Sequence, residues 1–292
     1  MKIFITGSTG FIGKCLLKQL VGHEILCLTR SPSADIGNTK IRYVIGDLQN
    51  YSTWASELAK FVPDIAIHLA WQGLPDYSRE ACELNISMSL KLLSVLVESN
   101  VKRVVVAGSC FEYGSAKGKL YESLLVHSDS EFANAKIRIL DEFDVVCRKT
   151  QIELVWSRIF YSFGQGQRDS SLLPSVYRSL VNGKKPLIKM PGAVQDFIFI
   201  EDVASALVKL ATTKSLGGVF NIGSGDAISV AQLVNLIAKY CGSDYCMENT
   251  DTLLGSWASI DKITNLTGWQ PSISLEQGIR QTVRDLETKN FG

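Results

Sequence analysis

The chain has 292 residues, 46% of them hydrophobic, which is enough to bury one large core or a large core with a smaller one attached. Thirty basic residues against 29 acidic ones leave a net charge of +1, so no overall field draws the chain to nucleic acid or to a membrane surface. Seven scattered cysteines without a Cys-x-x-Cys pair, and three dispersed histidines, predict neither a disulfide framework nor a metal site. The first residues carry no signal-peptide pattern and no apolar run reaches spanning length, so we expect a cytoplasmic protein.

Short β-rich runs alternate with longer helical patterns through the first part of the chain, which is typical of βαβ units and a parallel sheet. Strands are expected at Lys2–Thr6, Glu24–Thr29, Ile41–Ile45, Ile65–Leu69, Arg103–Ala107 and Glu153–Ser157. Helices are expected between them at Gly13–Val21, Ser52–Phe61, Arg79–Glu98 and Ser130–Arg148. The sequence therefore predicts an α/β fold with a Rossmann-type, doubly wound parallel sheet.

After Tyr161 the pattern changes to a cluster of glycine and polar residues, followed by helices separated by short strands. The helices are expected at Leu172–Leu180, Val203–Leu210, Val230–Tyr240 and Leu275–Leu286. We therefore predict a dinucleotide-binding domain over residues 1–161, to which later segments return, and a smaller α/β part over 162–292 that binds substrate mainly.

A glycine-rich turn follows the first expected strand and opens the first helix. It has the spacing Gly7-x-x-Gly10-x-x-Gly13. In this context the first glycine allows a tight turn, the second lets backbone N–H groups approach a pyrophosphate, and the third lets helix pack on strand. The turn predicts a dinucleotide site.

The end of the second expected strand bears on the choice of cofactor. A carboxylate there would bind the adenosine ribose 2′-hydroxyl, but the chain has Thr29-Arg30-Ser31 and no acid until Asp35. The guanidinium of Arg30 suits a 2′-phosphate, which favours NADP over NAD. Asp47 and Leu48, after the third strand, are expected beside the adenine.

Landmarks in a fixed order over nearly the whole chain resemble the extended short-chain dehydrogenase/reductases, which act on nucleotide-linked sugars. They are the glycine turn, Asp47-Leu48, His68 to Ala70, Asn85, Ser109 with Gly114, Arg158 to Phe160 with Gly164, Gln195 to Ile198, Glu201 to Val203, Asn221 to Gly223 and Gly268 to Pro271. The resemblance implies a nucleotide-diphosphate sugar as substrate and a homodimer that pairs through long helices.

The catalytic positions that the resemblance implies are Ser109, Phe132 and Lys136. The family places a Tyr-x-x-x-Lys pair on one helix, and the matching helix here reads Phe132-Ala-Asn-Ala-Lys136. The missing phenol would have passed a proton to or from the sugar oxygen, and losing such an acid typically costs about 10²- to 10⁴-fold in rate. Three explanations stay open: an engineered Tyr→Phe variant, a natural enzyme that uses another acid, and a cofactor-binding protein without turnover.

Other acids close in sequence could replace the phenol. They are Glu112, Tyr113, Tyr121 and Asp129. Dehydratases of the family place an Asp-Glu pair after the catalytic hydroxyl residue, whereas this chain has Cys110-Phe111, which disfavours dehydration. Because Arg30 favours the phosphorylated cofactor, we expect reduction of a nucleotide-linked 4-keto-6-deoxy sugar. The alternatives are a nucleotide-sugar epimerase and a non-catalytic NADP sensor.

The resemblance also implies binding residues. For the cofactor they are Gly7, Thr9, Gly10, Phe11, Ile12, Gly13, Arg30, Asp47, Leu48, Leu69, Ala70, Lys136 and Ile159. For the substrate they are Trp71, Ser109, Cys110, Tyr113, Phe160 and Arg168, with the buried-looking Arg158 as a further candidate for the sugar diphosphate.

Overall fold

The computed structural model describes residues 1–31, 40–248 and 255–290. The chain divides into two compact units, which are described in turn. The first comprises Met1–Ser115, Ser123–Arg158 and Ala204–Phe220. The second comprises Ala116–Glu122, Ile159–Val203 and the chain from Asn221 onward.

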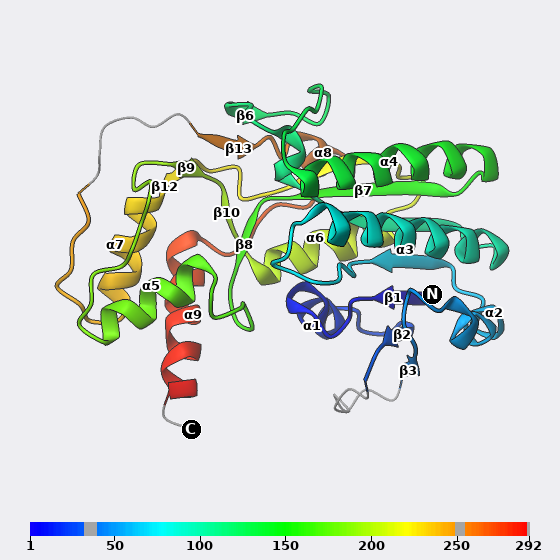
Figure 1. Ribbon diagram of the computed structural model, residues 1–292, viewed down its shortest axis with the longest axis horizontal. Helices are drawn as coiled ribbons and strands as arrows, with labels where there is room; N and C mark the ends of the chain where they lie inside the picture. Colours follow the sequence, from blue (N-terminus) through cyan, green and yellow to red (C-terminus); the bar gives the residue numbers. More distant parts are fainter. Residues whose placement is uncertain (32–39, 249–254, 291–292) are drawn as a thin grey trace. The chain divides into compact units, whose positions relative to one another are not determined.

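The first unit is built on a seven-stranded sheet (Figure 1). In sheet order its strands are β11 (Gly218–Ile222), β7 (Glu153–Ile159), β5 (Arg103–Ser109), β4 (Ile65–His68), β1 (Lys2–Thr6), β2 (Glu24–Thr29) and β3 (Ile41–Ile45). The strand β1 pairs in parallel with β2 on one side and with β4 on the other, so the direction of winding reverses beside β1. This topology confirms the predicted Rossmann-type sheet, and ligands of such sheets bind outside the carboxyl ends of the strands at the reversal.

Helices connect these strands. They are α1 (Phe11–Gln19), the 3₁₀ turn η1 (Tyr51–Thr53), α2 (Ala55–Phe61), α3 (Arg79–Glu98), the 3₁₀ turn η2 (Cys110–Tyr113), α4 (Glu131–Thr150) and α6 (Ile200–Thr212). The single helix predicted over Ser52–Phe61 is wrong in one respect, because Trp54 separates η1 from α2. The Trp54 indole donates a hydrogen bond to the Asp47 carbonyl at 2.9 Å, and this contact fixes the break.

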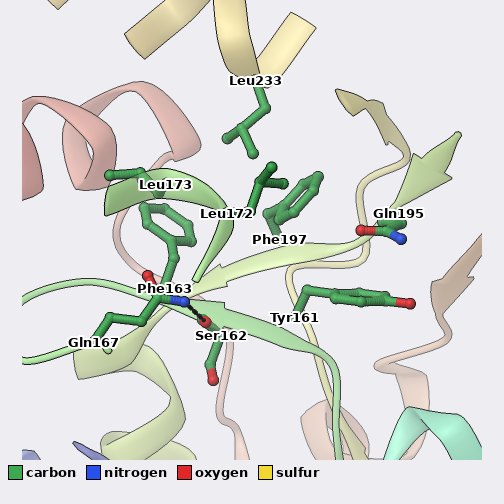
Figure 2. A pocket seen from close by; sticks show the side chains of 9 residues that line it. All are labelled: Tyr161, Ser162, Phe163, Gln167, Leu172, Leu173, Gln195, Phe197 and Leu233. Atoms are coloured by element: carbon green, nitrogen blue, oxygen red, sulfur yellow. Dashed lines mark hydrogen bonds between the residues drawn. The ribbon is translucent and has the colours of Figure 1, made fainter. Parts of the chain in front are cut away.

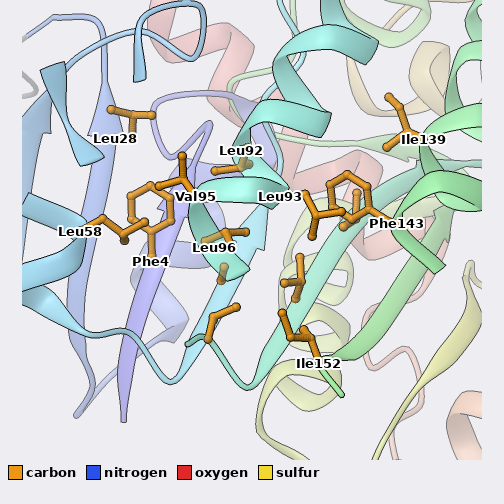
Figure 3. Close-up of a cluster of buried hydrophobic side chains, with 14 of the residues drawn as sticks. Phe4, Leu28, Leu58, Leu92, Leu93, Val95, Leu96, Ile139, Phe143 and Ile152 are labelled. Atoms are coloured by element: carbon orange, nitrogen blue, oxygen red, sulfur yellow. The ribbon is translucent and has the colours of Figure 1, made fainter. Parts of the chain in front are cut away.

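The core of the first unit follows from the alternation of side chains along the strands. Phe4 and Leu28 lie in one apolar cluster with side chains of α2, α3 and α4, as Figure 3 shows, and Leu26 belongs to the same cluster. Their neighbours Ile3 and Ile5 are also fully buried and point to the opposite face of the sheet. Both faces are therefore covered, as parallel sheets require.

The second unit contains shorter elements. They are β6 (Gly118–Leu120), β8 (Tyr161–Phe163), α5 (Leu172–Val181), β9 (Val194–Gln195), β10 (Phe197–Phe199), β12 (Ile228–Ser229), α7 (Val230–Tyr240), β13 (Ser256–Ala258), α8 (Asp261–Thr267) and α9 (Leu275–Asn290). One sheet pairs β10 with β8 and the other has the order β12-β9-β13-β6. The helix α8 was not expected from the sequence. In the described part of the chain, none of the helices combines the length and apolar character needed to cross a bilayer.

Candidate active site

The glycine turn between β1 and α1 has the shape that a dinucleotide pyrophosphate requires. Gly7 has a φ of +78°, and a Cβ there would lie 2.7 Å from the Ala70 nitrogen. A Cβ on Gly13 would lie 2.2 Å from the Gly7 carbonyl oxygen. Gly10 caps α1 without a side chain, so the N–H groups of the first turn face a space that no cap residue occupies. The backbone therefore fits a phosphate-bearing cofactor at this turn.

Other predicted cofactor residues surround this turn or lie nearby in the same unit. Leu69 and Ala70 follow β4, and their N–H groups donate to the backbone and side-chain oxygens of Thr6 at 3.1 and 3.4 Å. Arg30 is exposed at the end of β2. The Asp47 carboxylate accepts from the Gln49 N–H at 2.8 Å, and Leu48 packs against the core.

His68 joins the ends of β4 and β1 inside the unit. Its Nδ1 lies 2.7 Å from the Thr6 hydroxyl and its Nε2 lies 3.1 Å from the Ser89 hydroxyl. Complete burial, helped by the charge of Lys136, lowers the pKa of His68 to about 3. The ring is therefore neutral at physiological pH and has a structural role.

Ser109 ends β5 and caps η2. Its hydroxyl accepts from the Phe111 N–H at 3.2 Å, while its own N–H donates to the Glu112 carboxylate at 2.7 Å. This reciprocal pair is a capping box, which fixes the serine at the end of the strand. Cys110 is half-buried at the start of the same turn.

Glu112 is fully buried, which removes it from the candidate replacement acids. Its carboxylate accepts hydrogen bonds from the Trp156 indole at 3.0 Å and from the Arg158 guanidinium at 2.8 Å, besides the one from Ser109. Three donors hold this carboxylate as a structural anion.

The same network corrects the role suggested for Arg158. Only 3% of its side chain is exposed, because the guanidinium pairs with Glu112 and lies 4.5 Å from the centre of the Tyr113 ring. The suggestion that Arg158 binds the sugar diphosphate is wrong, since burial and the ion pair commit it to the core. Tyr113 is buried, and its ring packs against the Arg158 guanidinium.

Phe132 and Lys136 lie on one face of α4, one turn apart. The Lys136 ammonium donates to the Ala107 carbonyl on β5 at 2.7 Å and lies 4.3 Å from the centre of the Trp71 ring. Burial lowers the pKa of Lys136 to about 8, and the Coulombic effects of Glu112 and Cys82 oppose this decrease. The structure therefore brings Ser109, Phe132, Lys136 and Trp71 together in the first unit.

The loop that carries Trp71 is joined to α3 by the side-chain amide of Asn85, one of the landmarks of the family resemblance. Asn85 accepts from the Gln72 N–H at 2.7 Å and donates to the Gln72 carbonyl at 2.9 Å. The buried Trp71 indole N–H has no hydrogen-bond partner among the described residues.

The second unit holds a cavity of about 210 Å³. Its lining residues are Tyr161, Ser162, Phe163, Gln167, Leu172, Leu173, Gln195, Phe197 and Leu233. Figure 2 shows Leu233 from α7 and Phe197 from β10 facing each other across it. The Gln167 amide donates to the Ser162 carbonyl at 3.1 Å, but its buried oxygen has no hydrogen-bond partner in the described chain.

A buried carboxylate lies next in sequence to two residues that line the cavity. Asp196, between Gln195 and Phe197, accepts from the N–H groups of Ser224 at 2.7 Å and of Ala258 at 3.0 Å. Burial raises the pKa of Asp196, and the hydrogen bonds oppose that rise.

The remaining predicted residues of the second unit lie outside the cavity lining. Ile159 and Phe160 are buried, and Arg168 is exposed. Among the residues that the structure describes, no group of three or more His, Cys, Asp or Glu side chains could hold a metal ion.

The first unit contains a parallel sheet that reverses its winding beside β1, the glycine turn that follows β1, and the residues Ser109 and Lys136. Together with the family match below, these features define an NAD(P)-dependent enzyme of the extended short-chain dehydrogenase/reductase type. The family assignment is direct. Residues 3–223 match the NAD dependent epimerase/dehydratase family, and the chain belongs to it.

Similar proteins cover the same length. The chain is 25% identical to a GDP-6-deoxy-D-mannose reductase of Pseudomonas aeruginosa, over 99% of this chain and 98% of the relative. It is also 25% identical to a UDP-glucose 4-epimerase of Mycolicibacterium smegmatis, over 99% of this chain and all of the relative (100%). Its fold matches a UDP-glucose 4-epimerase from Thermotoga maritima, solved with UDP-glucose, with a TM-score of 0.87 at 22% identity over 99% and 100% of the two chains.

Proposed function

We propose that the chain reduces the keto group of a nucleotide-linked 4-keto-6-deoxy sugar, with NADPH preferred over NADH. The observation that carries this proposal is that Lys136 donates to the Ala107 carbonyl on β5, the strand that ends at the capped Ser109. A chain that only sensed cofactor would have no physical need for both. The likeness to a GDP-6-deoxy-D-mannose reductase supports the reaction class.

The roles of the residues follow from their chemistry. The glycine turn would hold the cofactor's pyrophosphate, and the exposed guanidinium of Arg30 would bind a 2′-phosphate. The cofactor, when bound, supplies a hydride. The ammonium of Lys136 would bind the nicotinamide ribose, and the Ser109 hydroxyl would donate a hydrogen bond to the reacting sugar oxygen.

For the nucleotide end of the substrate we propose the cavity in the second unit. Sites that enclose a drug-sized ligand have volumes of about 300–1,000 Å³. This cavity is smaller, so it suits a fragment such as a nucleobase. Phe197, Leu172 and Leu233 offer apolar surface for the faces of a base. The unpartnered oxygen of Gln167 offers an acceptor for a base N–H.

Epimerisation is the second candidate, favoured by the equal identity to a UDP-glucose 4-epimerase. A panel of nucleotide-linked sugars and 4-keto sugars, followed by cofactor absorbance and by product analysis, separates the two. A reductase consumes one reduced cofactor per product, whereas an epimerase interconverts sugars with no net consumption. The Phe132→Tyr form serves as the positive control, because it restores the family's phenol. If neither form converts any sugar, the non-catalytic alternative stands.

The nucleotide pocket has its own test. Leu173→Trp fills the cavity and should raise KM by about tenfold at unchanged kcat, because it removes binding that the ground and transition states share. Leu187→Trp, at a position that is 91% exposed, is the matched control. An unchanged KM in Leu173→Trp contradicts the pocket assignment.

The homodimer through α3 and α4 stays a prediction from the resemblance. Light scattering on the purified chain tests it.

A further inference from the structure

The ring of Phe132 lies in an aromatic cluster with three side chains from two other segments of the first unit. Trp71 meets it edge-on with centroids 4.9 Å apart, Tyr77 at 5.1 Å and Phe111 at 6.1 Å. The ammonium of Lys136 lies 5.9 Å from the same centroid. These are the side chains that could act where the phenol is missing.

Two members of this set carry a proton that chemistry near neutral pH can use. An indole N–H and a phenylalanine ring give up none, which leaves Tyr77 and Lys136. Lys136 is 8% exposed, donates to the Ala107 carbonyl and lies against the Trp71 face. Tyr77 is 42% exposed, so solvent can return a proton to it after each turnover.

The backbone on both sides of Tyr77 is held in place. Before it, Asp76 donates its N–H to the Gly73 carbonyl at 2.8 Å. After it, Ser78 donates its N–H to the Asp76 carboxylate at 2.8 Å and caps α3 through the Ala81 N–H at 3.3 Å. A side chain on such an anchored loop is a positioned group, as acid catalysis requires.

We propose that Tyr77 is the proton donor of this enzyme and replaces the phenol absent at Phe132, an inference that rests on the proposed reductase function. The carbonyl carbon of the sugar takes the hydride supplied by the reduced cofactor. As the carbonyl π bond breaks, the sugar oxygen takes the proton of the Tyr77 hydroxyl. The Tyr77 phenolate then takes a proton from water, so one ketone, one reduced cofactor and one proton give one alcohol and one oxidised cofactor.

The test compares Tyr77→Phe in two backgrounds, the Phe132 chain and the Phe132→Tyr form. In the Phe132 chain we expect Tyr77→Phe to lower kcat by about 100-fold or more. In the Phe132→Tyr background the same change should cost less than about threefold, because the restored phenol donates the proton. Tyr51→Phe, at another tyrosine that is 41% exposed, is the matched control and should leave kcat unchanged.

Two further readouts separate proton donation from a structural role. The melting temperature and the NADPH affinity, followed by tryptophan fluorescence, should be the same in Tyr77→Phe and the Phe132 chain.

Several results overturn the inference. An equal loss in both backgrounds means that Tyr77 is structural, and an unchanged kcat of Tyr77→Phe in the Phe132 chain means that Lys136 or water supplies the proton. A Phe132 chain that is inactive beside an active Phe132→Tyr form means that the site has no acid. If every form, including Phe132→Tyr, fails on all sugars, the proposed function itself is wrong and the inference falls with it.

Discussion

Two places in the first unit differ in what they retain of the family's chemistry. At the glycine turn, Gly7 and Gly13 leave room only for hydrogen atoms, so the backbone keeps the close approach that the family's turn needs. At the start of α4, Lys136 keeps its hydrogen bond to Ala107 but the ring one turn earlier carries no hydroxyl. The turn and the phenol position belong to separate segments, so a sequence can change one and keep the other.

The largest expected effect is at the glycine turn. In Gly13→Ala the new Cβ would meet backbone atoms of Gly7 and Ser8 at 2.2 and 2.6 Å, which no side-chain movement relieves. We expect loss of NADPH binding by calorimetry and destabilisation of about 4 kcal/mol or more. Gly10→Ala, whose Cβ would lie 3.2 Å from the Gly7 oxygen, is the milder control. Equal binding in Gly13→Ala would show that the turn is not the pyrophosphate site.

The next effect concerns the ion pair under Ser109. Glu112→Ala leaves the Arg158 guanidinium buried without its anion, and we expect a loss of about 3–5 kcal/mol in the free energy of unfolding, measured with urea. Glu83→Ala breaks the exposed pair with Arg138 and should cost at most about 1 kcal/mol. Similar losses in the two variants would contradict the structural role of Glu112.

His68 gives a smaller effect that depends on pH. Because its pKa in the folded chain is lowered to about 3, the unfolded chain binds the extra proton first as pH falls below 6.5. Its contribution to stability is therefore complete above pH 6.5 and decreases as pH falls toward 3. Relative to His68→Gln, the Phe132 chain should lose about 2–3 kcal/mol of unfolding free energy between pH 7 and 4.5, measured by urea unfolding at each pH. An equal pH dependence in the two chains would contradict the buried neutral ring.

The smallest expected effect concerns the choice between NADPH and NADH at Arg30. Arg30→Ala should weaken NADPH about tenfold and leave NADH unchanged, since only the 2′-phosphate needs the guanidinium. Arg42→Ala, an exposed arginine on β3, is the control. Fluorescence titration with both cofactors measures the ratio. An unaltered ratio of NADPH to NADH affinity in Arg30→Ala would show that Arg30 does not bind the 2′-phosphate.

The elements that the sequence predicted best carry their signals locally. The helix Arg79–Glu98 begins after Ser78, whose hydroxyl caps it, and the bounds agree at both ends. The break at Trp54 depends on a contact with the Asp47 carbonyl, which periodicity does not report. The family assignment likewise rested on motifs in order and is confirmed.

The site was predicted less completely because its decisive contacts are between segments far apart in the chain. The pairing of Arg158 with Glu112 spans 46 residues, so a buried-looking arginine was taken for a ligand of the substrate. Tyr77 was not considered at all, because only the fold brings its ring against Phe132. A polar residue in an expected strand, such as Arg158, could be recognised from the sequence, but its hydrogen-bond partner Glu112 could not.

Asn85 links a loop to a helix. Its side-chain amide bonds both backbone groups of Gln72, as a neighbouring strand would, and its second N–H also reaches the Ala81 carbonyl within α3. Aspartate would lose the donor, and glutamine would place it one methylene too far. Through this one amide the segment that bears Trp71 is joined to α3 by side-chain hydrogen bonds, and Tyr77 lies on the same segment directly before the helix N-cap Ser78.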